Sequence, residues 1–121
     1  MRKTFYKDLV VWQKSIELVS DIYKITKNFP KEEIFGITSQ MRRAAISISS
    51  NIAEGSGRGT GKDFVHFLII SIGSALELET QIEIAFRLQL INELNYNRIT
   101  SLLTEIIKML RGLIRSLATR N

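Results

Sequence analysis

The chain has no cysteine, one proline and one histidine among its 121 residues. The lack of cysteine excludes a disulfide scaffold, a thiolate zinc site, an iron–sulfur cluster and a cysteine nucleophile. Hydrophobic runs are short: the longest, residues 64–72, contains His66 and Ser71 and falls well below the ~20 residues of a membrane span. The N-terminus is charged and lacks the apolar segment of an export signal. We therefore expect a cytoplasmic protein with no membrane partner.

The length and composition predict one globular domain over residues 1–121. Apolar residues make up 45% of the chain and charged residues 24%, which is ordinary for a folded soluble protein. The formal net charge is +5. A basic balance favours a polyanionic partner such as RNA or DNA, although an excess this small also occurs in proteins without one.

Four long segments rich in strong helix formers dominate the sequence, and no strand-like alternation is present. They predict helices over about 8–27, 31–54, 60–90 and 95–118. Pro30 ends the first helix and opens the second, Thr60 and Asp63 form a capping pattern for the third, and Asn95 is placed to cap the fourth. Short connections between these helices predict an all-α, antiparallel up-down four-helix bundle.

The third predicted helix is apolar around most of its circumference, whereas each helix of a single four-helix bundle has one face exposed to solvent. One apolar face comprises Phe64, Leu68, Ala75, Ile82 and Phe86; residues pointing nearly the opposite way are Ile70, Ile84 and Leu88. Since monomers rarely expose large apolar patches, the surplus predicts a homo-oligomer.

A carboxylate falls on the apolar face of this helix, because Glu79 lies between Ala75 and Ile82 on the helical wheel. A buried carboxylate is costly unless it is hydrogen-bonded or paired. We therefore expect a polar network that joins Glu79 to Gln40 and Asn51 of the second helix, with Arg43 as a further partner. Its role is either to fix helix register or to form a pocket.

Seven cations are candidates for nucleic-acid contact. They are Arg42 and Arg43 of the second helix, Arg58 and Lys62 in and after the glycine-rich segment 55–61, and Lys108, Arg111 and Arg115 of the fourth helix. The last three form either a stripe that follows phosphates or a solvated cationic face. The segment 55–61 follows a helix and lacks the Gly-Lys-Ser/Thr ending of a phosphate loop, so it is interpreted as a connector.

Catalytic machinery is missing from the sequence. The single histidine, His66, lies in an apolar run, so no activated nucleophile is predicted. Asp63 and His66 form one Asp-x-x-His element, but a bundle-type di-metal site needs two such elements. We expect no enzyme activity, no metal and no cofactor.

Several motifs resemble a known family. They are FYKDLVVWQK at 5–14, FP at 29–30, EIFG at 33–36, QMRRAA at 40–45, SISSNIAEG at 47–55, GR at 57–58 and GSALELETQ at 73–81. In order and spacing they are similar to the four-helix-bundle proteins encoded within intervening sequences of bacterial 23S ribosomal RNA genes, often called ribosomal proteins. The family also resembles the accessory protein of diversity-generating retroelements, a basic barrel that binds nucleic acid and a reverse transcriptase. The resemblance implies a ring-like homo-oligomer of five subunits with no enzymatic activity.

Taken together, these features favour a homo-oligomeric protein that binds nucleic acid or acts as a scaffold, with RNA as the preferred ligand. Tyr6 and Tyr96 are the candidate exposed aromatics, so we expect contacts to the nucleic-acid backbone without strong sequence preference. The alternative is a protein-interaction module without a nucleic-acid ligand, such as an accessory subunit of a polymerase or reverse transcriptase.

Overall fold

The computed structural model describes residues 5–119, and over that range its secondary structure is entirely helical. The four long helices are α1 (Val10–Thr26), α2 (Ser39–Ser56), α3 (Gly61–Arg87) and α4 (Glu93–Ala118). Two short 3-10 helices, η1 (Tyr6–Asp8) and η2 (Lys31–Glu33), and a π-helical segment, η3 (Ile34–Thr38), precede α1 and α2. The predicted all-α class is thus confirmed.

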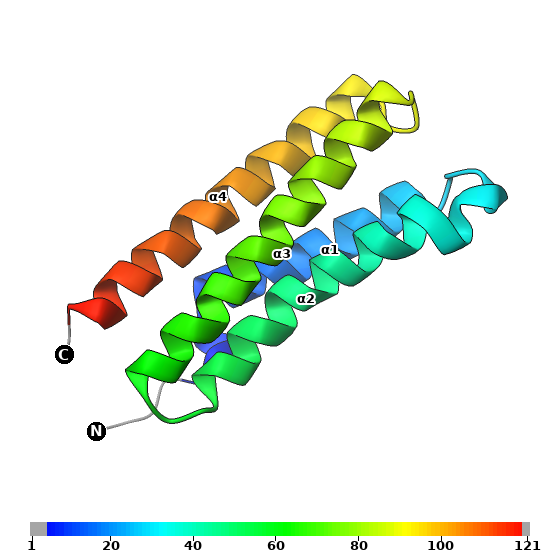
Figure 1. Cartoon of the computed structure of the whole chain (residues 1–121). Coiled ribbons are helices and arrows are strands. Elements are labelled where there is room, and N and C mark those ends of the chain that lie inside the picture. The colour runs from blue at the N-terminus through cyan, green and yellow to red at the C-terminus, as the bar shows by residue number, and fades with distance from the viewer. Residues whose placement is uncertain (1–4, 120–121) are drawn as a thin grey trace.

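The long helices form a four-sided arrangement in which the chain reverses direction at each connection (Figure 1). Helix α2 packs against α1 and α3, and α4 packs against α3 and α1. The connection between α2 and α3 lies at the same end of the molecule as the end of α4, whereas the other two connections lie at the opposite end (Figure 1).

The core is built from one apolar seam on each helix. On α2 and α4 the buried residues recur every three or four positions, and residues at this spacing fall on the same side of a helix. The largest fully buried side chains are Leu18, Ile22, Met41, Ile48, Ile52, Leu68, Leu78, Ile82, Ile99, Leu103, Ile106 and Leu110.

The second predicted helix is not continuous, and the expectation of one helix over 31–54 is wrong. Its backbone is interrupted at Gly36, whose φ of −107° and ψ of −118° lie outside the helical region. Regular α-helix resumes only at Ser39. A glycine has no Cβ to disfavour this conformation, so the break falls at this residue.

Helices α2 and α3 approach each other closely, and small residues permit it. A Cβ on Gly55 would lie 2.7 Å from the Cβ of Phe67 and 3.1 Å from Cδ1 of Phe64. Two serine contacts further along hold the same pair of helices. The Ser71 hydroxyl donates to the Ile48 carbonyl at 3.0 Å, and the hydroxyls of Ser47 and Ser74 lie 2.8 Å apart.

Side-chain caps fix the beginnings of α3 and α4. The Thr60 hydroxyl oxygen accepts from the Asp63 amide at 3.1 Å, as the capping pattern predicts. At α4 the cap is Asn92, whose Oδ1 accepts from the Asn95 amide at 2.8 Å, so the expectation that Asn95 is the cap is wrong. The helix begins two residues earlier than predicted because the extended residue Asn92 satisfies its free amide.

Among the described residues, α3 is the one helix long and apolar enough to cross a membrane by length and composition. The core helix of a water-soluble protein passes the same test. In this fold α3 buries one side against its neighbours in the bundle, with Leu68, Ala75, Leu78 and Ile82 in the core.

Gly55→Ala tests the close approach of α2 and α3. We expect a loss of ~1–2 kcal/mol in the free energy of unfolding, because overpacking outweighs the better helix propensity of alanine. Gly112→Ala in α4 is the matched control, since its Cβ would meet nothing nearer than Nη2 of Arg115 at 3.8 Å. It should stabilise by ~0.5–1 kcal/mol. Urea unfolding followed by circular dichroism measures the free energy of unfolding of both variants. Equal stabilisation by the two substitutions would contradict the close approach of α2 and α3.

Candidate nucleic-acid interface

Helix α4 ends beside the connection between α2 and α3 (Figure 1). Five of the seven predicted cations lie in the second half of α4 or within two residues of this connection. Leu117 of α4 lines a hollow of about 140 Å³ together with Gly55, Gly59, Thr60 and Phe64. The fold therefore brings the α4 cations Lys108, Arg111 and Arg115 into the half of the molecule that holds Arg58 and Lys62.

The α4 cations are exposed and carry uncompensated charge. Within residues 5–119, Lys108, Arg111 and Arg115 form no ion pair. The nearest acidic residue before them on the helix, Glu105, is already paired with Lys14 of α1 at 2.7 Å. Seven residues of α-helix span ~10 Å, so the three cations offer charge along that length of α4.

Arg58 and Lys62 differ in how free their charges are. Arg58 pairs with Glu54 at 3.0 Å, and its guanidinium lies 4.8 Å from the centroid of the Phe67 ring. Lys62 is exposed in the first turn of α3 and forms no ion pair in the described chain. Lys62 is therefore the better placed of the two to meet a phosphate, and the positive end of α3 supports an anion there.

Arg42 and Arg43 are separated from this end, because Arg42 lies sixteen positions before Arg58 and the chain between them, almost all helical, spans ~24 Å. Arg42 is half-buried. Its Nε donates to Oγ1 of Thr26 at 2.9 Å, and its guanidinium lies 4.4 Å from the centroid of the Tyr23 ring. Arg42 thus joins α1 to α2, whereas Arg43 beside it is exposed.

A groove of about 410 Å³ contains both arginines, and we call it the Phe35 groove. Its lining comprises Tyr23, Ile34, Phe35, Thr38, Ser39, Arg42, Arg43 and Ile46. Phe35 is 96% exposed. Sequence reasoning missed this side chain because it placed Phe35 inside a regular helix. The two aromatics it favoured are engaged instead: Tyr6 lies edge-on to Trp12, and Tyr96 stacks on Phe86 with centroids 4.0 Å apart.

The predicted polar network does not form, because its central premise is wrong. Glu79 and Gln40 are both exposed, and Asn51 donates to the carbonyl and the hydroxyl of Ser47 in its own helix. Ser74 marks the side of α3 that faces α2, whereas Glu79 lines a groove with Tyr96 and Thr100 of α4. Glu79 therefore points away from Gln40 and Asn51, and Arg43 does not neutralise it.

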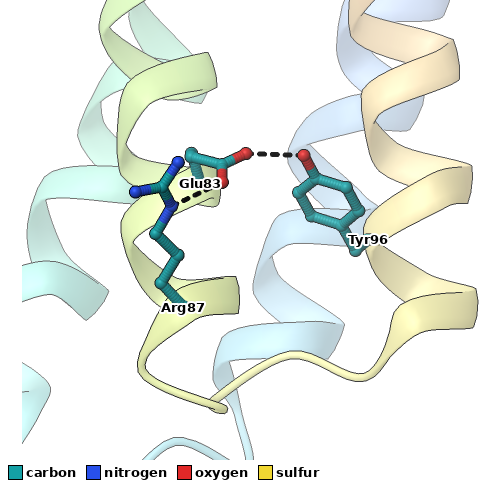
Figure 2. Close-up of polar contacts among 3 residues, drawn as sticks. All are labelled: Glu83, Arg87 and Tyr96. Atoms are coloured by element: carbon teal, nitrogen blue, oxygen red, sulfur yellow. Dashed lines mark hydrogen bonds and ion pairs between the residues drawn. The ribbon is translucent and has the colours of Figure 1, made fainter.

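Glu83, Arg87 and Tyr96 form a polar cluster in the same groove between α3 and α4 (Figure 2). The Tyr96 hydroxyl donates to Oε1 of Glu83 at 2.6 Å, and Nε of Arg87 donates to Oε2 at 2.9 Å. The hydrogen bond from Tyr96, followed by that from Arg87, lowers the pKa of the Glu83 carboxyl. The same hydrogen bond raises the pKa of Tyr96, because ionisation would place a phenolate against a carboxylate.

His66 is exposed and lies edge-on to Phe67 at a centroid distance of 5.5 Å. Among residues 5–119, no group of three or more histidine, aspartate or glutamate side chains is placed to hold a metal ion.

Comparison with known proteins places these features in a family. The family model for the 23S rRNA-intervening sequence protein matches residues 7–112. A solved structure of a protein of unknown function from the S23 ribosomal protein family of Bacteroides thetaiotaomicron is similar with a TM-score of 0.81 and 32% identity. The match covers 88% of this chain and 96% of that one. No curated protein matches the chain.

The pKa of Tyr96 tests the Glu83 cluster. We expect the Tyr96 phenol to ionise above the ordinary tyrosine pKa of about 10, and Glu83→Gln to lower that pKa towards it. Since the Tyr96 pKa is raised on folding, its stabilisation is present below pH ~10 and is lost as the pH rises through the raised pKa. The contribution of Glu83 to the free energy of unfolding is present above pH ~4.3, and it is lost as the pH falls through the lowered pKa of the Glu83 carboxyl.

Nuclear magnetic resonance of ring-labelled tyrosine follows the titration of Tyr96 separately from the titrations of Tyr6 and Tyr23. Glu77→Gln is the matched control, because Glu77 is exposed on the same helix and is not among the residues that line the groove with Tyr96. An unchanged Tyr96 pKa in Glu83→Gln would contradict the assignment of the hydrogen bond.

Proposed function

The chain belongs to the 23S rRNA-intervening sequence protein family, and on that basis we propose that it is a non-enzymatic homo-oligomer that binds RNA through exposed cations. The unit of assembly in this proposal is an antiparallel four-helix bundle, and the assembly is a cytoplasmic ring. Five is the subunit number that the family resemblance implies. Membrane binding has no part in the proposal.

The binding part of the proposal depends on one observation, the unpaired cations of α4. Lys108, Arg111 and Arg115 are exposed, and within the described chain no carboxylate neutralises them. Cations of this kind gain free energy from phosphates by releasing condensed counterions, and the interaction does not read sequence. Lys62 and Arg58 extend the charge at the same end of the bundle.

The assembly part depends on the outer face of α3, which we define as Ile69, Ile70, Leu76, Ile84 and Leu88. All five side chains are exposed. They fall within ~120° on a helical wheel and form one strip, which also contains His66, Glu77 and Thr80. Gly73 lies within this strip, and no atom lies within 4 Å of the position its Cβ would take. A second helix can therefore approach α3 closely there.

A protein-interaction module without RNA is the second candidate function, because the same strip suits a different protein as well as another copy of the chain. In that case the purified complex would contain one stoichiometric protein partner and no RNA. An accessory subunit of a polymerase or reverse transcriptase is the corresponding role.

Substitution of the outer face of α3 tests assembly. We expect Leu76→Lys/Ile84→Lys to weaken self-association by about a hundredfold or more, because each buried apolar side chain contributes roughly 1.5–3 kcal/mol. The helical content should persist, since both side chains lie outside the core of the single chain. Multi-angle light scattering measures the mass, and Leu94→Lys is the control because Leu94 is 77% exposed outside this strip. A wild-type monomer at micromolar concentration would reject assembly.

The salt dependence of RNA binding tests the cationic interface. For a single-stranded RNA we expect the slope of log K against log[salt] to fall by up to about 1.4 in Arg111→Gln/Arg115→Gln, because each phosphate contact contributes about 0.7. Lys24→Gln/Lys27→Gln makes the same change in charge at the opposite end of the bundle and should alter the slope less. Fluorescence anisotropy measures the binding. No binding at low salt would reject the proposed function, and equal slopes in the two variants would reject its placement on α4.

A further inference from the structure

The Phe35 groove holds a combination of groups that the cationic interface does not explain. Phe35, Ile34, Tyr23 and Ile46 are exposed apolar side chains that line one hollow with two arginines. A single exposed apolar residue is ordinary, whereas several around one groove indicate a binding surface. The interruption at Gly36 produces this arrangement, because a regular helix through residue 36 would give Phe35 a different direction.

The charges in the groove are all of one sign. Its lining includes Arg42 and Arg43 and no carboxylate. Arg42 is held over the Tyr23 ring and bonded to Thr26, so its charge has a fixed position. Arg43 is exposed and forms no ion pair within residues 5–119, so its guanidinium is free to contact an anion.

An unsatisfied hydroxyl is the second, independent sign of a ligand. Thr38 lines the groove and is 3% exposed, and its Oγ1 has no hydrogen-bond partner. Buried polar groups in native proteins are almost always hydrogen-bonded, so an exception needs an explanation. A bound group with a donor or an acceptor that reaches this oxygen would satisfy it.

We propose that the Phe35 groove binds one unpaired nucleobase, which stacks on the Phe35 ring, while Arg43 contacts the adjoining phosphate and the Thr38 hydroxyl bonds the edge of the base. This inference rests on the proposed nucleic-acid binding and adds to it a preference for single strands. Aromatic side chains stack on bases of any sequence, whereas a duplex keeps its bases paired and unavailable. The absence of carboxylates from the lining favours a nucleotide over a basic peptide.

Binding of a single-stranded and a fully paired RNA of equal length tests the groove. In fluorescence anisotropy, Phe35→Ala should weaken binding of an oligoadenylate about tenfold or more, which is the loss expected for one stacked base. Binding of the duplex should be unchanged, and Phe35→Trp should retain binding of the single strand. Leu94→Ala is the control, because it removes an exposed apolar side chain outside the groove.

Thr38→Val separates recognition from folding. Valine has the same shape without the hydroxyl, so the unfolding midpoint should stay the same or rise, since no hydrogen bond is lost in the free protein. Binding of the oligoadenylate should nevertheless weaken by about two- to tenfold. Equal binding of the oligoadenylate by Thr38→Val and wild type would show that the Thr38 hydroxyl does not bond the base.

The outcomes distinguish this inference from the function on which it rests. If wild type binds both RNAs and Phe35→Ala binds them equally well, the groove is not a base site although the chain binds RNA. If Phe35→Ala lowers the oligomer mass and leaves RNA binding intact, the groove contacts protein, which also overturns the inference. If wild type binds neither RNA at low salt, the proposed function fails and this inference fails with it.

Discussion

Helix α3 has more apolar surface than its neighbours in the bundle cover, and the proposed roles of the rest of the surface depend on this excess. Its buried side packs in the core, whereas Ile69, Leu76 and Ile84 remain outside. The lysine and arginine of α3, Lys62 and Arg87, occupy its two ends. The middle of α3 therefore has no lysine or arginine, and the proposed contacts to a polyanion lie on α4, near the connection between α2 and α3, and on Arg43 of α2. The proposed assembly through an apolar strip and the proposed RNA binding through separate cationic surfaces both depend on this division.

The two groups of arginines serve different physical purposes. Arg42 stabilises the fold, because its contacts to Tyr23 and Thr26 join α1 to the beginning of α2. This point lies just after the interruption of the backbone at Gly36. Thr26 also donates to the carbonyl of Ile22 at 2.7 Å, so the end of α1 is fixed by the same contact. Arg111 and Arg115 are exposed and form no ion pair within residues 5–119. A sequence motif containing adjacent arginines thus combines a structural residue, Arg42, with a free one, Arg43.

Periodicity predicted the helices and most of their faces, because a repeat of three and four residues depends only on local geometry. It predicted the exposed side of α3 through Ile70, Ile84 and Leu88. It failed for Glu79, because a wheel gives an angle but not which neighbour covers that angle, and Glu79 faces the groove towards α4 rather than α2. It failed for Phe35 because one glycine barely changes the summed helix propensity of a segment, although Gly36 redirects the chain. The base site proposed here depended on both the break and the burial of Thr38, which only the tertiary structure provides.

The proposed binding sites reinforce each other only if the chain assembles. One subunit offers a cationic end and, ~24 Å away along α2, a groove for a single base. Each is modest alone, since exposed phosphate contacts are screened by salt and one stacked base contributes only ~1–3 kcal/mol. In a closed homo-oligomer both recur on every subunit, and an RNA held by one subunit meets the next at a high effective concentration. Affinity then increases with the number of subunits rather than with the contacts of any one. The excess apolar surface of α3 would thereby contribute to RNA binding, although none of its side chains touches the nucleic acid.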